Sequence, residues 1–194
     1  MKEANKVLQS SVGKVTVGYA DGRCSFGSCF LFSKHLFVLT CHHVIANTIS
    51  IQVDLCEWRG IDVTVVAQDE DLDLAVLKLD IPGVNIHNLP YVKLSPEIVI
   101  GDVAFCSGFF QGSFQLTDGC VMHNRKVPRK ILVTNITDHG VSGGPATGRF
   151  ILNFIGIVRA QSGIAYPRTE LIPHLIVDMF LKRYPNIPQM EIFL

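Results

Sequence analysis

The chain lacks the features that would point to a membrane or to nucleic acid as a partner. Its 17 basic and 17 acidic residues cancel, and only 18% of its 194 residues are charged. Its apolar residues come in short runs, and none comes near the roughly 20 residues that span a bilayer. With no basic face and no spanning segment, neither nucleic acid nor a membrane is expected as a partner.

A secretory signal and a zinc motif are lacking as well. The first residues, MKEANKVLQSSVGK, contain no apolar core of the kind that directs export. None of the six cysteines has the C-x-x-C spacing of a zinc site, and thiols stay reduced inside cells. We therefore predict an intracellular chain, in the cytoplasm, the nucleus or an organelle matrix and not secreted, that needs no metal and no cofactor.

What the sequence does contain is a series of short β-rich runs. They are GKVTVGYA, SCFLF, LFVLT, ISIQVDL, DVTVVAQ, LAVLKL, DVAFCSGFF, KILVTNI and FILNFIGIVRA, and turn formers such as ADGR and DIPG separate them. Runs at this spacing are typical of antiparallel barrels and sandwiches. The length suits one compact all-β domain.

Two segments look helical. The first is KEANKVLQ, near the N-terminus. The second, TELIPHLIVDMFLKRY, would place Ile172, Leu175, Ile176 and Met179 on one helical face. We expect this helix to dock on the β-domain through that face, followed by an extended tail.

One serine, Ser142, stands in the glycine-rich stretch TDHGVSGGPA, residues 137–146. Most such clusters are only turns. A serine hydroxyl is a poor nucleophile until a base removes its proton and a third group orients that base. The chain offers two histidines at the end of LFVLTCHHVI and three aspartates in DEDLDLAVLKL, namely His42, His43, Asp69, Asp71 and Asp73.

Each of these groups has a plainer interpretation when it is taken alone, as a surface histidine or a solvated acidic turn. In chain order, however, a histidine after a strand, an aspartate before a strand and a serine in a glycine-rich turn follow the order of the chymotrypsin-type triad. The motifs LTCHHV, DLAVLKL and GVSGGP resemble those of trypsin-like serine proteases, over about residues 24–173.

Two groups within that family are similar to different parts of the chain. DLDLAVLKL and LNFIGIV resemble the HtrA/Deg proteases. CSFGSCFLFSKHLFVLTCHHVI and GIAYPRTELIP resemble the peroxisomal leader-peptide-processing protease and nuclear trypsin-like proteases. The resemblance implies two packed six-stranded antiparallel β-barrels within a single protease domain, residues 1–194. The lobes would cover about 10–85 and 95–168, and a C-terminal helix and tail 169–194.

The resemblance also implies a serine endopeptidase that acts on a protein or peptide through an acyl-enzyme. In the family pattern T-x-x-H, Thr40 makes His43 the base, so that His42 is only its neighbour. Asp73 would orient His43, and Ser142 would attack. The backbone N–H groups of Gly140 and Ser142 would form the oxyanion hole.

The same alignment implies a specificity pocket. Ile136, six residues before the serine, would form its floor, and the walls would come from Arg159, Ala160, Gln161 and Gly163. A buried cation against an isoleucine would cost several kcal/mol, so an apolar side chain is expected before the scissile bond. Arg159 would add a preference for acidic substrate residues nearby.

The sequence departs from the family at two points. Val141 stands where digestive and clotting members carry an aspartate, and Val44 where secreted members carry a half-cystine. An alternative is therefore a catalytically silent, protease-like module that binds a peptide or supports assembly. A viral-type cysteine protease is disfavoured because the nucleophile position holds serine. Association into a homo-oligomer, or with further domains of a longer native chain, is compatible with each of these interpretations.

Overall fold

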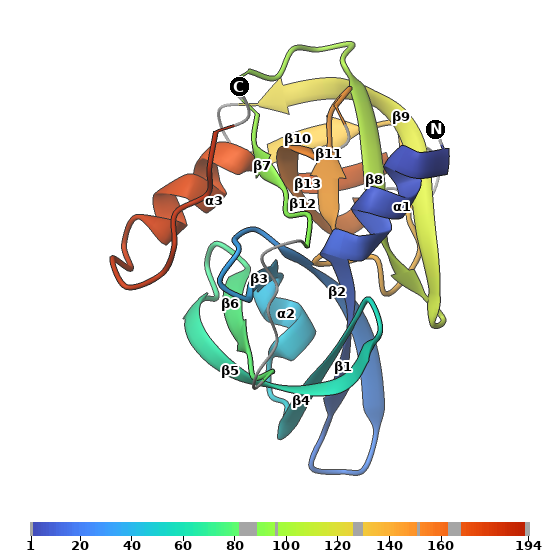
Figure 1. Cartoon of the computed structure of the whole chain (residues 1–194). Coiled ribbons are helices and arrows are strands. Elements are labelled where there is room, and N and C mark those ends of the chain that lie inside the picture. The colour runs from blue at the N-terminus through green and yellow to red at the C-terminus, as the bar shows by residue number, and fades with distance from the viewer. Residues whose placement is uncertain are drawn as a thin grey trace.

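The computed structural model describes residues 2–81, 89–95, 97–125, 130–150, 152–162 and 168–192. Two β-barrels lie one above the other, with the N-terminal half of the chain in one and the C-terminal half in the other (Figure 1). The predicted fold class is confirmed. In the described part of the chain, no helix is both long and apolar enough to cross a membrane.

The first barrel is closed, in the order β1-β2-β3-β6-β5-β4, and its six strands pair antiparallel. Its strands are β1 (Val12–Gly18), β2 (Cys24–Leu31), β3 (Phe37–Thr40), β4 (Ser50–Leu55), β5 (Trp58–Asp69) and β6 (Leu74–Leu79). The short helix α2 (His42–Ile45) directly follows β3. Alternation explains the later part of β1, in which Val15 and Val17 are buried while Lys14 and Thr16 are only half-buried.

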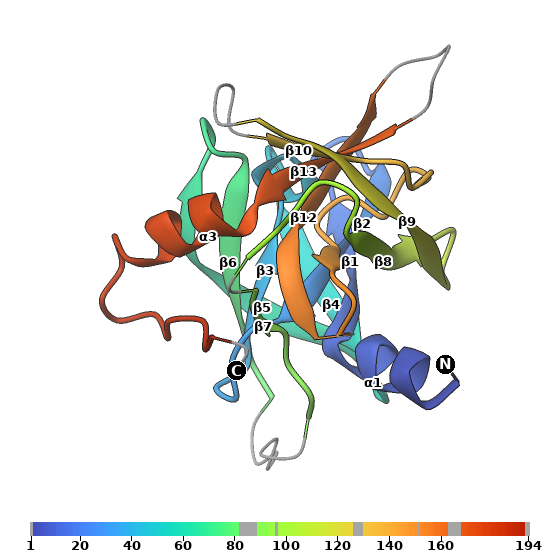
Figure 2. The ribbon, with the colours of Figure 1, turned by 90° about the horizontal axis from the view of Figure 1, so that it is seen from above.

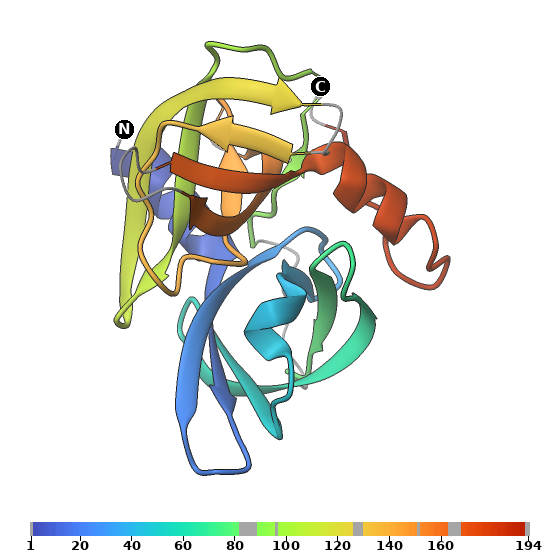
Figure 3. The same cartoon turned by 180° about the vertical axis from the view of Figure 1, so that it is seen from behind.

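The second barrel has the order β11-β8-β9-β10-β13-β12, and a β11–β12 pairing closes it. Its strands are β8 (Val103–Phe110), β9 (Ser113–Arg125), β10 (Lys130–Val133), β11 (Pro145–Thr147), β12 (Asn153–Ser162) and β13 (Arg168–Pro173). The two-residue β7 (Lys93–Leu94) adds a parallel partner to β12. Figure 3 shows this barrel from behind, with α3 at its side.

The long strand β9 and the strand β13 were missed by the sequence analysis. Asp118 and Gly119 interrupt the apolar pattern of β9, but its pairing with β8 runs unbroken from Val103↔Cys120 to Phe110↔Ser113. β13 lies in the segment that was expected to begin the C-terminal helix and tail. It pairs with both β10 and β12 and so belongs to the second barrel.

The C-terminal helix α3 covers only His174–Leu181, and of its predicted apolar face only Ile176 belongs to the buried side of the helix. Pro173 ends β13 and stands at the N-cap, so Ile172 precedes the helix. Leu175 and Met179 are 62% and 46% exposed. The buried face is formed by Ile176, Val177, Phe180 and Leu181, since the helix starts later than the apolar pattern suggested.

The two barrels share one core. Phe30 of β2 and Phe154 of β12 are both fully buried, and their ring centroids lie 5.1 Å apart. The N-terminal helix α1 (Lys2–Ser11), which the sequence analysis expected, buries Leu8 in the same cluster. Seen from above, β1 and β2 pass close to β8 (Figure 2). Groups on the facing surfaces of the two barrels can therefore meet.

Candidate active site

His43 and Asp73 meet at the edge of the first barrel. Both carboxylate oxygens of Asp73 lie near the His43 ring, with Nδ1 at 2.9 Å from Oδ1 and 2.8 Å from Oδ2. The backbone N–H of His43 also donates to Oδ1 at 2.9 Å. Asp73 has a left-handed backbone, with φ of 57°, in the turn before β6. Three contacts thus fix the imidazole against one carboxylate.

The surroundings keep Asp73 ionised. Burial raises the pKa of its carboxyl group, but hydrogen bonds from His43 and the charge of Arg159 outweigh burial, and the net pKa is below the ordinary value. An ionised carboxylate at this position accepts from Nδ1–H of His43. The proton on Nδ1 leaves the other ring nitrogen, Nε2, free to act as a base.

The structure separates His43 from its neighbours in sequence. His43 and Asp73 line an open hollow of about 450 Å³. His42 does not make the contacts described for His43, but its side chain lines this hollow too, together with Glu70. Asp69 instead forms an ion pair of 2.7 Å with Arg183. The T-x-x-H spacing indicated His43, and the position directly before the strand indicated Asp73. These are the two side chains that contact each other.

The turn that carries Ser142 has a tightly constrained backbone. Gly140 and Gly143 have φ of 101° and 88°, a region that favours glycine. A Cβ atom on Gly140 would lie 2.6 Å from the carbonyl oxygen of Phe109, and one on Gly143 would collide with the carbonyl oxygen of Ser28. The backbone N–H of Ser28 donates to the carbonyl oxygen of Ser142 at 2.9 Å. Both glycines are therefore required by space as well as by conformation.

Ser28 is a member of the site that the sequence analysis missed. Its buried hydroxyl donates to the carbonyl oxygen of Gly140 at 2.7 Å and accepts from the N–H of Phe109 at 2.8 Å. The carbonyl oxygen of Ser28 accepts from the Thr40 hydroxyl at 2.7 Å. No local motif marks Ser28, because its partner Gly140 lies 112 residues away in the chain.

The hydroxyl of Ser142 donates to the carbonyl oxygen of Arg159, at 3.0 Å. The side chain of Arg159 turns to the first barrel, where Nε lies 3.1 Å from Oδ2 of Asp73. Its Nη1 lies 3.4 Å from Oε1 of Glu170, which is paired with Lys130 at 2.9 Å. Arg159 was expected to line a pocket wall, but its guanidinium binds these two carboxylates.

The predicted specificity pocket is only partly described. Ile136 is 57% exposed, whereas its neighbours Asn135 and Thr137 are buried, so Ile136 points outward from the second barrel. Ala160 and Gln161 lie on β12, but their side chains fall outside what the structure describes, and so does the whole of Gly163. An exposed Ile136 is not an enclosed floor.

Cys41 brings a thiol close to His43 and Asp73. One ligand atom from each of the three lies within 4.8 Å of the others. Burial, followed by the charge of Asp73, raises the pKa of the Cys41 thiol well above its ordinary value. Metals and nucleophilic chemistry both require the thiolate, so this thiol fits neither role. It donates to the carbonyl oxygen of Val158 at 3.4 Å.

The N–H groups of Gly140 and Ser142 are the two donors that the sequence analysis predicted for an oxyanion hole. In the described ranges, the N–H groups of Gly140 and Ser142 donate to no protein acceptor, whereas those of Val141, Gly143 and Gly144 bond to carbonyl oxygens. Two neighbouring free donors beside a serine hydroxyl form a place where an anionic oxygen can be bound.

Two packed antiparallel barrels, with a histidine–aspartate pair on the first and a glycine-rich serine turn directly before β11 of the second, define the chymotrypsin-fold class. Residues 27–151 match the model of the trypsin-like peptidase domain. The chain belongs to this family, and within it the chain is similar to the HtrA group.

Three comparisons illustrate the similarity. The chain is 34% identical over 137 residues to a probable periplasmic serine endoprotease DegP-like of Halomonas elongata, covering 66% of this chain and 28% of that protein. It is 33% identical over 173 residues to one of Chlamydia pneumoniae, covering 80% of this chain and 34% of that protein. The structure of the HtrA-type protease AlgW with tripeptide has a TM-score of 0.79 at 26% identity, over 93% of this chain and 61% of that one. The chain thus spans about a third of the length of these curated relatives.

The predicted intracellular, non-secreted location is contradicted. Several relatives are named periplasmic endoproteases. The prediction rested on the first residues and on unpaired thiols. The structure buries Cys29, Cys41 and Cys106 in the barrels, where a thiol stays free because it has no access to a partner. These three buried thiols are therefore no guide to the compartment.

Proposed function

We propose that this chain is a serine endopeptidase in which Ser142 is the nucleophile, His43 the general base and Asp73 the group that orients the base. The observation that carries the proposal is that both carboxylate oxygens of Asp73 lie within hydrogen-bond distance of Nδ1 of His43, at 2.9 and 2.8 Å. It holds the imidazole with Nε2 free, beside a turn that presents one serine.

In the proposed reaction, Nε2 of His43 takes the proton of the Ser142 hydroxyl as Oγ attacks the scissile carbonyl carbon. The oxygen that becomes negative is stabilised by the N–H groups of Gly140 and Ser142. His43 then returns the proton to the leaving amine, and water hydrolyses the acyl-enzyme by the same steps. No metal or other cofactor is needed for any of these steps.

The serine hydroxyl must first leave the carbonyl oxygen of Arg159. In the proposed reaction, rotation about its Cα–Cβ bond redirects it to His43, and hydrogen bonds of a catalytic site commonly tighten only when substrate is bound. The same contact is the observation in favour of the second candidate, a catalytically silent protease-like module that binds peptides.

A fluorophosphonate probe separates the two candidates. We expect the wild-type chain to gain the mass of one phosphonyl group on Ser142, and Ser142→Ala to gain none. Ser10→Ala is the matched control, because the Ser10 hydroxyl makes an exposed hydrogen bond within α1, to the carbonyl oxygen of Lys6. If the wild-type chain is not labelled under any condition in which it is folded, the endopeptidase proposal is wrong.

The proposed substrate is a protein or peptide, and the relative solved with a tripeptide supports this class of ligand. We keep as a proposal that Ile136, Ala160, Gln161 and Gly163 contact the side chain before the scissile bond and favour an apolar one. Cleavage sites in a denatured proteome test it, with Ile136→Asp as the informative variant. Predominant cutting after Lys or Arg by the wild type would contradict it.

We further propose that residues 1–194 form one protease domain. The shared core across the barrels supports this, because Phe30 and Phe154 pack together from different barrels. Association into a homo-oligomer or with further domains stays a prediction, which sedimentation of the purified chain would test.

A further inference from the structure

Arg159 contacts both halves of the proposed catalytic site. It belongs to β12 of the second barrel, and its carbonyl oxygen accepts from the Ser142 hydroxyl at 3.0 Å. Its Nε donates to Oδ2 of Asp73, which belongs to the first barrel, at 3.1 Å. One residue thereby connects the nucleophile to the carboxylate that orients the base.

A β-bulge gives Arg159 this position. In the pairing of β12 with β13, Val158 opposes Leu171 and Ala160 opposes Glu170, so the register shifts at Arg159. A bulge leaves one residue without a partner opposite it and redirects its side chain. Arg159 can therefore direct its carbonyl oxygen to the serine turn and its guanidinium to the first barrel.

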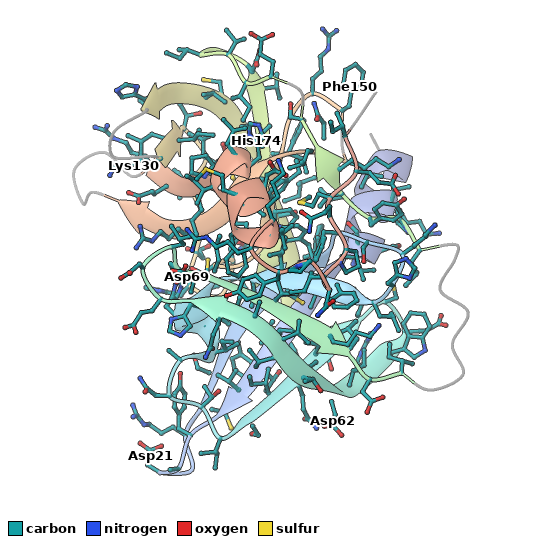
Figure 4. All side chains as sticks on the ribbon, turned by 90° about the vertical axis from the view of Figure 1, so that its left-hand side faces the viewer. Asp21, Asp62, Asp69, Lys130, Phe150 and His174 are labelled. Atoms are coloured by element: carbon teal, nitrogen blue, oxygen red, sulfur yellow. The ribbon has the colours of Figure 1, made fainter. Side chains whose placement is uncertain are left out.

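The guanidinium is held at its far side as well. Nη1 of Arg159 lies 3.4 Å from Glu170, and Glu170 pairs with Lys130 at 2.9 Å. Figure 4 shows Lys130, the last of these groups, on the second barrel; the labelled Asp69, at the end of β5, marks the side of the first barrel. The side chain of Glu170 is only 16% exposed, which weakens screening by solvent. The four groups Asp73, Arg159, Glu170 and Lys130 alternate in charge.

We propose that Arg159 is a positioning residue, which fixes the orientation of the Asp73 carboxylate and through it the ring of His43. The proposal rests on the proposed function of the site. Oδ2 of Asp73 receives donors from both barrels, His43 Nδ1 and Arg159 Nε. Without the second donor, the carboxylate is held by His43 alone, and the imidazole that it orients is aligned less precisely toward Ser142.

The positioning role of Arg159 replaces the role expected from the sequence, in which Arg159 would favour acidic residues of the substrate. The positive charge of Arg159 already faces two carboxylates, at 3.1 Å and 3.4 Å. An acidic substrate side chain would have to displace one of them. The geometry also suits an arginine, since its planar guanidinium serves Asp73 and Glu170 through two separate nitrogens, Nε and Nη1, whereas a lysine ammonium has all its donors on one nitrogen.

The test compares Arg159→Gln and Arg159→Lys with the control Arg183→Gln. Arg183 pairs with Asp69 at 2.7 Å and is 53% exposed, close to the 46% of Arg159, but it does not touch Asp73. We expect Arg159→Gln to lower kcat and the rate of phosphonate labelling about 10- to 100-fold with little change in KM, as for other small misalignments. Arg159→Lys should restore part of the loss, and Arg183→Gln should change neither rate.

A second measurement does not depend on turnover. The Nδ1–H proton of His43, hydrogen-bonded to a carboxylate, should give a low-field proton resonance that His43→Gln removes. We expect Arg159→Gln to shift or broaden it and Arg183→Gln to leave it in place. An unchanged resonance in folded Arg159→Gln, or a loss confined to KM for acidic substrates, would overturn the proposal. If the wild type is not labelled at all, the endopeptidase function fails, while the resonance still decides the role of Arg159.

Discussion

Replacing Ser28 by alanine tests how the serine turn is held. Ser28 is fully buried, and its hydroxyl bridges the N–H of Phe109 and the carbonyl oxygen of Gly140, at 2.8 and 2.7 Å. Alanine removes both bonds, and it leaves the two part-buried backbone groups without this partner. Ser28→Ala should therefore disturb both folding stability and the loop that begins the proposed oxyanion hole.

The magnitude follows from the two lost contacts. Each hydrogen bond contributes about 0.5–1.5 kcal/mol, and each buried group left unpaired costs about 1–3 kcal/mol. Because relaxation of the turn recovers part of this, we expect the free energy of unfolding to fall by about 2–4 kcal/mol. For a chain of this length, the corresponding loss in Tm is about 5–15 °C.

Urea unfolding followed by tryptophan fluorescence measures this difference, with Ser10→Ala as the control. The hydroxyl of Ser10 also donates to a carbonyl oxygen, that of Lys6 at 2.9 Å, but at an exposed position in α1. Its loss should change the free energy of unfolding by no more than about 0.5 kcal/mol. A loss for Ser28→Ala no larger than for Ser10→Ala would refute the reasoning that Ser28 is the buried anchor of the serine turn.

Three further predictions concern the site itself. His43→Ala should abolish phosphonate labelling of Ser142 while His42→Ala leaves it largely intact, because of the two histidines it is His43 that is hydrogen-bonded to Asp73; equal losses in two folded variants would show that the base is misassigned. Gly143→Ala should fail to fold or lose several kcal/mol by thermal unfolding, since its φ is 88° and the new Cβ meets the Ser28 carbonyl oxygen. Burial raises the pKa of Asp73, but hydrogen bonds from His43 and the charge of Arg159 outweigh burial, so folding lowers this pKa. Ionised Asp73 therefore stabilises the fold at pH values above the ordinary carboxyl pKa of about 4, and this stabilisation is lost as the pH falls through the pKa of the folded state. The free energy of unfolding of the wild type should accordingly fall more steeply below about pH 4 than that of Asp73→Asn; parallel curves in urea titrations would contradict this.

Local patterns predicted much of the fold. The run LAVLKL coincides with β6, Leu74–Leu79, and the ends of β1, β3, β4 and β8 lie within two residues of the predicted runs. In these strands, apolar side chains on consecutive or alternate positions record burial directly in the sequence. β9 was not predicted because its interior includes Asp118 and Gly119, and only pairing with β8 makes that segment a strand.

The C-terminal helix shows how a single residue changes a periodic pattern. The spacing of Ile172, Leu175 and Met179 fits a helix, but Pro173 delays its start to His174. β13 then takes Ile172 into the sheet, and Leu175 and Met179 face solvent. Apolar composition predicted a helix that docks, whereas the helical face depended on where the preceding strand ended.

By itself, the sequence determined the class of fold and the choice of His43 and Asp73 as the pair that meets, because both follow from short motifs beside apolar strands. Only the tertiary structure decided which groups hold that pair and the serine turn. Ser28 and Gly140 are 112 residues apart, and Arg159 and Asp73 are 86 apart. Contacts at such separations have no local periodicity, since closure of the barrels and a bulge in β12 bring the groups together.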